Sequence, residues 1–221
     1  MEHLPMRTED FLEYVARLKE NLGIDLRVAA PGIIKTVDYA RQTCTVQLAI
    51  REAMNVEGDI EWAEIPVLPD VPFFVYSGGG YCLTLPVSPG DDCLVVFGDN
   101  CIDAWWQSDG IQNQPDYRRH DLSDGFAIVG FRSQPQVIGG FSAGSAQLRN
   151  ADGSACIEIS GSSINIQGSS VTINGQTTVN GQTAINGRTT IQGGTTIDGK
   201  NFLGHTHSGV KGGGDKSGGV S

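Results

Sequence analysis

The chain has 221 residues and a formal net charge of −10, with 25 acidic against 15 basic residues. This excess of acid argues against a nucleic-acid-binding protein, which needs a basic surface to displace counterions. The longest apolar runs fall far short of the roughly 20 residues that a transmembrane helix needs, and no signal peptide is recognisable at the start. We therefore expect a soluble protein whose partner is another protein.

Five cysteines, at positions 44, 82, 93, 101 and 156, form an odd set without a CxxC motif or metal-ligand spacing. This pattern predicts unpaired thiols in a protein that is made in a reducing cytoplasm.

The first predicted element is a helix within an N-terminal segment of residues 1–27. Thr8 can cap this helix and Gly23 can end it. Its apolar stripe consists of Phe11, Val15, Leu18 and Leu22. The stripe predicts packing against a neighbour rather than chemistry.

Residues 28–141 form the second predicted unit, which is rich in short strands. Apolar residues alternate with polar ones from Cys44 to Ile50, as in a half-buried strand. Further strands are predicted around Ile33–Val37, Ile60–Val67, Val71–Tyr76, Cys82–Val87 and Cys93–Phe97. So many short strands in about a hundred residues indicate a small barrel or sandwich, with the OB-fold as one candidate.

Residues 142–203 carry a repeat in which an apolar residue is followed two positions later by glycine. The pairs are Ile159/Gly161, Ile166/Gly168, Ile173/Gly175, Val179/Gly181, Ile185/Gly187, Ile191/Gly193 and Ile197/Gly199. The step is seven residues at first and then six. An even step keeps each repeated residue on one face of a strand, whereas each seven-residue step would need a slip such as a bulge.

The number of repeats indicates how this segment folds. A single-chain hexapeptide β-helix needs about three hexads per coil and at least three coils, which this repeat does not supply. Three chains wound around one axis would bury the Ile and Val faces together and pair every strand edge. A disordered linker is the alternative, but a linker would not keep isoleucine in register. We therefore predict a trimeric triple-stranded β-helix.

His205 and His207 continue the odd-numbered face of the repeat into residues 204–221, the predicted apical tip. Without a slip between Gly199 and His205, three chains would place six imidazoles around one point. Zinc prefers four ligands, so six favour iron, with nickel or cobalt as alternatives. Such a shell has no open position for substrate, and the metal would join the chain ends. The alternative is that His205 and His207 are simply a pair of exposed polar residues.

The densest charged cluster consists of Arg118, Arg119, His120, Asp121 and Asp124. No nucleophile or second carboxylate is placed by the sequence to complete a catalytic set, so we expect an ion-pair corner or a subunit contact. Three tryptophans, Trp62, Trp105 and Trp106, could stack on a sugar or base. We favour their burial in the barrel core or at a trimer contact.

Three segments together resemble the central spike proteins of contractile phage tails, the baseplate assembly protein V family. They are Pro66–Pro72 with the Ser-Gly-Gly-Gly that follows, Asp103–Trp106 leading to Arg118–Asp124, and His205–Val210 at the tip. The resemblance implies a homotrimer with an OB-type barrel, a β-helical shaft and one octahedral iron per trimer held by His205 and His207. It also implies docking on baseplate hub and tail tube proteins, at the tail tip of the virion.

The sequence therefore predicts a mainly β, non-enzymatic spike that caps the tail tube and pierces the host outer membrane, in a phage or a tail-like particle. It is made in the host cytoplasm and binds no nucleic acid. One alternative is a trimeric receptor-binding fibre, which would end in a globular head. A hexapeptide acyltransferase is another, but it would need more coils and a histidine between them, and the repeat contains none.

Overall fold

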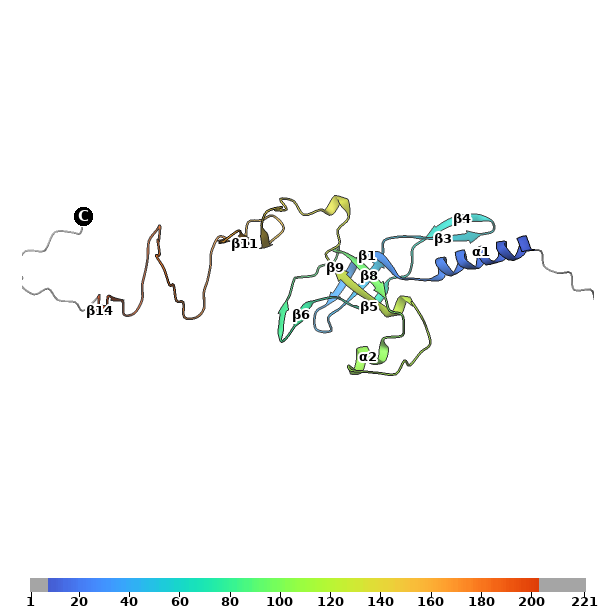
Figure 1. Cartoon of the computed structure of the whole chain (residues 1–221), viewed down its shortest axis with the longest axis horizontal. Coiled ribbons are helices and arrows are strands. Elements are labelled where there is room, and N and C mark those ends of the chain that lie inside the picture. Colours follow the sequence, from blue (N-terminus) through green and yellow to red (C-terminus); the bar gives the residue numbers. More distant parts are fainter. Residues whose placement is uncertain (1–7, 203–221) are drawn as a thin grey trace, which may run out of the picture.

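The computed structural model describes residues 8–202, and within them the chain is mainly β, as predicted (Figure 1). Helix α1 comes first and is followed by a sheet-rich body and then by a long extended segment. None of the helices in the described part is long and apolar enough to cross a membrane. The helices are α1 (Thr8–Asp25) and α2 (Asp103–Ser108), with the short 3-10 turns η1 (Leu122–Asp124) and η2 (Gln134–Gln136).

The body is built on a five-stranded sheet with the order β5-β2-β1-β8-β9, in which every hydrogen-bonded pair of strands is antiparallel. These strands are β1 (Ala29–Asp38), β2 (Thr43–Leu48), β5 (Leu68–Pro72), β8 (Asp92–Phe97) and β9 (Gly125–Val129). The sheet curls until its two edges approach each other. Phe73, just after β5, forms an isolated parallel bridge with Ala127 of β9, and the Phe74 amide donates to the Ala127 carbonyl at 2.8 Å. We call this element the curled sheet.

The core lies inside the curl, because strands with one face inward bury every second residue. Strands β2 and β8 show this alternation over Cys44–Leu48 and Cys93–Phe97, which confirms the predicted periodicity. Gly32 of β1 lies so close to the core that a Cβ there would come within 2.5 Å of Val46 Cγ1. The absence of a side chain at this position therefore lets β1 pass over its neighbours.

Two hairpins project from the body: β3 (Glu52–Val56) with β4 (Asp59–Ala63), and β6 (Tyr76–Gly78) with β7 (Tyr81–Leu83). Nearly all of their residues are exposed. Three predicted strands need correction here. Ile60–Val67 is a strand only up to Ala63, and Cys82–Val87 is a strand only up to Leu83. The strand predicted over Val71–Tyr76 begins already at Leu68, because Leu68 pairs with Val46 of β2, and it ends at Pro72.

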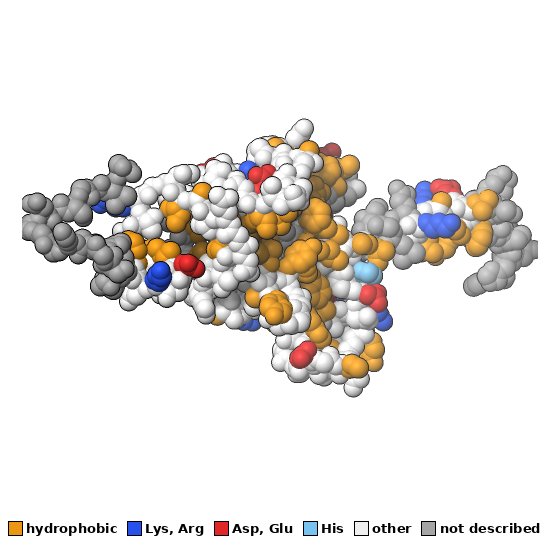
Figure 2. Space-filling model, turned by 60° about the vertical axis from the view of Figure 1, so that its left-hand side comes forward, with side chains coloured by type: hydrophobic (Ala, Val, Ile, Leu, Met, Phe, Trp, Pro, Cys, Tyr) orange, Lys and Arg blue, Asp and Glu red, His pale blue; other side chains and the backbone are white. Residues whose placement is uncertain are grey.

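Helix α1 extends two residues past the predicted stop at Gly23 and projects away from the curled sheet (Figure 1). The link from α1 to β1 is short and is held on both sides. Arg27 forms an ion pair with Glu52, and the Phe97 amide donates to the Val28 carbonyl at 2.9 Å. Figure 2 shows α1 standing apart, with hydrophobic side chains open to solvent.

After the body the chain forms what we call the shaft segment, residues 142–202. It begins with a three-stranded antiparallel sheet of β10 (Ala146–Arg149), β11 (Cys156–Ser160) and β12 (Ser163–Gln167). An extended stretch follows and reaches the small hairpin of β13 (Thr196–Ile197) and β14 (Lys200–Asn201). The predicted domain limits at 27, 141 and 203 remain predictions.

Candidate functional site

The first repeats of the shaft segment form one apolar face on the sheet β10–β11–β12. Residues paired across antiparallel strands lie side by side, and alternate residues along a strand share a face. The strand register therefore gives two lines of apolar residues across the sheet, Leu148–Ile157–Ile166 and Ala146–Ile159–Ile164. The opposite face is polar, and there Gln147 Nε2 donates to Glu158 Oε1 at 3.1 Å.

The chain reverses direction within the first seven-residue step, where the sequence predicted a bulge. The turn between β11 and β12 lies at Gly161–Ser162, and Gly161 has a φ of 56°, a conformation that glycine adopts without strain. An odd step would change faces in a continuing strand. The antiparallel reversal instead returns Ile166 to the face that carries Ile159.

From Val171 to Ile197 the apolar residues of the repeat are all exposed. Their exposed fractions lie between 58% and 68%, for Val171, Ile173, Val179, Ile185, Ile191 and Ile197. The backbone bends at Gly175, Gly181, Gly187 and Gly193, so the six-residue period of the sequence is also a period of the chain path. Between these bends the residues are in no assigned strand.

In the described part of a single chain, no layer covers these six residues, which we call the apolar row: Val171, Ile173, Val179, Ile185, Ile191 and Ile197. Single apolar residues on a surface need no explanation, but a regular series of exposed branched apolar residues indicates a surface that a partner covers. Unpaired extended backbone in addition offers N–H and C=O groups to a neighbouring strand. The shaft segment is thus suited to association along its length.

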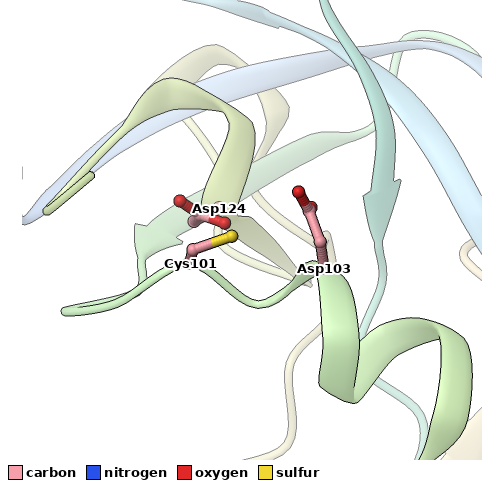
Figure 3. Close-up of side chains that lie close together, drawn as sticks. All are labelled: Cys101, Asp103 and Asp124. Atoms are coloured by element: carbon pink, nitrogen blue, oxygen red, sulfur yellow. The ribbon is translucent and has the colours of Figure 1, made fainter. Parts of the chain in front are cut away.

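A second candidate site lies at one end of the curled sheet, where Arg118 forms ion pairs with both Asp124 and Asp103. Figure 3 shows the two carboxylates together with Cys101. The Asp124 side chain is 0% exposed. Its Oδ2 accepts from Arg118 Nε at 2.7 Å, and its Oδ1 accepts from Arg118 Nη2 at 2.9 Å and from the Ile102 amide at 2.9 Å. Arg118 Nη2 also lies 2.9 Å from Asp103 Oδ1. We call this set the ion-pair corner.

The ion-pair corner has the ligand types of a cation site, because Cys101, Asp103 and Asp124 place their ligand atoms within 4.8 Å of one another. Arg118, however, already satisfies both carboxylates. Its hydrogen bond to Asp124 is the main cause that raises the pKa of the guanidinium above its ordinary value. A divalent cation would have to compete with this charge, so the corner is a structural link between α2 and η1.

The other members of the predicted charged cluster separate in the structure. Arg119 Nη1 and His120 Nε2 both face Asp99, at 3.0 and 3.4 Å. Asp121 instead accepts from the Ser123 amide at 2.9 Å, and this hydrogen bond lowers the pKa of the carboxyl group. The five residues therefore lie near one another, as expected, but they form separate contacts and not one cluster.

The tryptophans do not lie in the core of the curled sheet. Trp62 on hairpin β3–β4 is 65% exposed, and Trp105 on α2 is 45% exposed. Trp105 and Trp106 border a cavity of about 500 Å³ beside Phe126, whose ring centroid is 5.9 Å from that of Trp105. Burial in the core was thus a wrong prediction for Trp62 and Trp105, while a role at a subunit contact remains a prediction.

The predicted metal ligands His205 and His207 lie outside the described residues. Two features of the described part were not predicted from the sequence: strand β3 with its pairing to β4 in a protruding hairpin, and the contact of Arg118 with Asp103. Gly58, after Glu57, was a sequence signal for the turn of this hairpin, because tight hairpin turns favour glycine at positions of positive φ and Gly58 adopts such a φ. No local signal connects Asp103 with Arg118, which lies 15 positions further along the chain.

Residues 30–130 match the family model of the phage protein Gp138 N-terminal domain. No curated protein matches the chain. The match begins inside β1 and ends just after β9, so it covers the curled sheet and leaves α1 and the shaft segment outside. The similarity supports a phage structural protein, of the tail or baseplate type.

Proposed function

We propose that this protein is the central spike at the tip of a contractile phage tail or tail-like particle, where it caps the tail tube and pierces the host outer membrane. The apolar row of the shaft segment carries this proposal. It follows a unit that matches a phage domain, and it has the regular spacing of a fibrous element. A non-enzymatic, mechanical role accounts for both features.

Three copies wound around one axis would cover the apolar row. Burying an isoleucine side chain contributes about 1.5–3 kcal/mol, so six apolar positions per chain supply a large driving force for assembly. Each strand edge would gain a partner at the same time. The product is a narrow prism that resists bending, as a piercing element must.

The curled sheet fits the base of such a spike. Its order β5-β2-β1-β8-β9 and the parallel bridge between Phe73 and Ala127 support a five-stranded barrel of the OB type. At the base, the proposed partners are the baseplate hub and the tail tube, at the tail tip of the virion. The net charge of −10 argues against nucleic acid as a further partner.

At the opposite end, His205 and His207 are the proposed metal ligands. Two imidazoles per chain give six in a trimer, a donor set that suits an octahedral iron. When bound, such a metal would supply cross-linking energy between chain ends and no reaction. The chain itself would contribute the ligands and the glycine-rich segment around them.

The oligomeric state is the first test. Light scattering on the purified protein should give the mass of a trimer, and a monomer would contradict the proposal. Ile185→Asp, on the apolar side of the repeat, should reduce the trimer to monomers, because three buried carboxylates would repel one another. Asn186→Asp, on the polar side, is the matched control and should remain trimeric.

The metal is tested separately. Elemental analysis of the trimer should give about one iron per three chains, the stoichiometry of a six-imidazole site. Changing His205 and His207 together to alanine should remove the iron and leave the curled sheet folded by circular dichroism. A metal-free trimer would refute the iron site without refuting the shaft.

A further inference from the structure

Helix α1 presents an apolar face that nothing in the described part of the chain covers. Phe11 and Leu18 are 50% and 46% exposed, and Leu12 and Tyr14 are 62% and 60% exposed. The helix meets none of the strands of the curled sheet in a packed contact, and it points away from the shaft segment (Figures 1 and 2). A single helix of 18 residues is only marginally stable in water.

The spacing of these residues identifies the kind of neighbour. Phe11, Val15 and Leu18 are separated by four and then three positions, the alternation by which helices pack along one another in a coiled coil. Leu12 and Tyr14 flank this seam and widen it. A stripe wider than the two seam positions suits a helix that contacts more than one other helix.

The charged residues of α1 are arranged to permit contact between identical helices. Glu13 and Arg17 lie on the side away from Val15, where they form an ion pair of 2.7 Å with side chains 63% and 74% exposed. Within Phe11–Lys19 the seam itself carries no carboxylate, although the whole chain has an acidic excess. Identical α1 helices could therefore meet without repulsion between carboxylates on this part of the seam.

The attachment of α1 to the body favours its projecting position over one folded back onto the curled sheet. The Arg27–Glu52 ion pair and the hydrogen bond from Phe97 to Val28 fix the chain within three residues of the helix end. Folding α1 back onto the curled sheet would have to disturb these contacts. A neighbouring copy, in contrast, would bring its own α1 in parallel.

We propose that the α1 helices of three copies form a parallel three-helix bundle at the base of the assembly, seamed by Phe11, Val15 and Leu18. This inference rests on the proposed trimer. The bundle joins the chains at the end opposite the shaft segment. The α1 seam is then an internal contact of the trimer, which leaves hairpin β3–β4 and the outer charged face of the helices for other proteins.

Cysteine cross-linking tests the bundle in the full-length protein. The background is Cys82→Ser, because Cys82 is the one cysteine of the described residues in the exposed class, while the others are buried or partly buried. Leu18→Cys places a thiol in the seam, and Arg17→Cys, on the outer face, is the matched control. Val15→Cys is a second seam variant in case the thiols at position 18 are poorly aligned for a disulfide. The samples are oxidised and run on a non-reducing gel, and their mass is measured by light scattering.

The bundle predicts disulfide-linked dimers for a seam variant, up to about two thirds of the chains, because one of three symmetric thiols finds no partner. Arg17→Cys should stay at the level of the background protein. A trimer in which neither seam variant exceeds the Arg17→Cys control would overturn the bundle and leave the spike proposal standing. A monomeric background protein would instead overturn the spike proposal, and the bundle with it.

Discussion

Asp124 should be the carboxylate on which the stability of the curled sheet depends most. Its side chain is 0% exposed, and it receives hydrogen bonds from Arg118 Nε, Arg118 Nη2 and the Ile102 amide at 2.7 to 2.9 Å. Changing Asp124→Asn keeps the shape and an acceptor for Ile102. It removes the charge that compensates the guanidinium, and it exchanges an acceptor oxygen for an N–H₂ group.

The magnitude follows from the surroundings of Arg118. Leaving one partner of a buried ion pair uncompensated typically costs about 3–5 kcal/mol. Arg118 is 22% exposed and keeps its contact with Asp103 at 2.9 Å, so part of its charge remains solvated and paired. We therefore expect a loss of about 2–3 kcal/mol in the free energy of unfolding.

Urea denaturation followed by tryptophan fluorescence, at one fixed protein concentration, measures this loss. Asp99→Asn is the matched control, because Asp99 is 69% exposed and its ion pair with Arg119 lies at the surface. Such pairs contribute at most about 1 kcal/mol. Equal destabilisation by the two variants would refute the structural role of the ion-pair corner. A value near zero for Asp124→Asn would show that Arg118 needs no buried partner.

Two further predictions concern the core. Gly32→Ala should lower the free energy of unfolding by about 1–3 kcal/mol, because the new Cβ would lie 2.5 Å from Val46 Cγ1. Gly78→Ala is the control, since Gly78 lies in a strand with open space around it and its substitution should change the urea midpoint little. Similar effects of the two substitutions would contradict the close approach at Gly32. Burial raises the pKa of the Cys93 thiol to about 12 and shields its sulfur from the reagent, so at pH 8 a disulfide reagent should modify Cys93 at least about a hundredfold more slowly than the exposed Cys82. Equal rates, followed by mass spectrometry, would contradict a tightly packed core.

Sequence periodicity predicted those strands that have one buried face. In β2 and β8 the inward residues are nearly inaccessible and the outward residues are not, so the alternation of apolar and polar residues reports the fold directly. The hairpin β3–β4 was predicted only in part, as a strand from Ile60, since both of its faces are open to solvent and do not impose an alternation. The start of β5 at Leu68 was also missed, because its partner Val46 lies more than 20 positions away.

The ion-pair corner shows a different limit of sequence reasoning. Arg118 and Asp124 lie close together in the sequence and could be grouped. Asp103 joins them only because α2 and η1 meet at one end of the curled sheet. Contacts of this kind depend on the path of the chain in space, which cannot be deduced from the spacing of residues in the sequence.

In the shaft segment the sequence predicted the period but not the direction of the chain. Glycine bends every six residues from Gly175 to Gly193 agree with the repeat. The reversal at Gly161 does not follow from periodicity, because a hairpin and a continuing strand with a slip both return Ile166 to the face of Ile159. Pairing partners, which one sequence does not specify, decide between the two.

The two parts of the chain differ in what can hold them together. Val95 in the curled sheet is 0% exposed, whereas Ile185 in the shaft segment is 66% exposed. The curled sheet therefore carries its own hydrophobic stabilisation, and that of the shaft segment must come from association. The proposed trimer should therefore show two unfolding transitions, one of the shaft segment and one of the curled sheet. Only the transition of the shaft segment should move to higher urea as the chain concentration rises, because it depends on association. Dilution of the chain would therefore destabilise the shaft segment while the curled sheet stays folded.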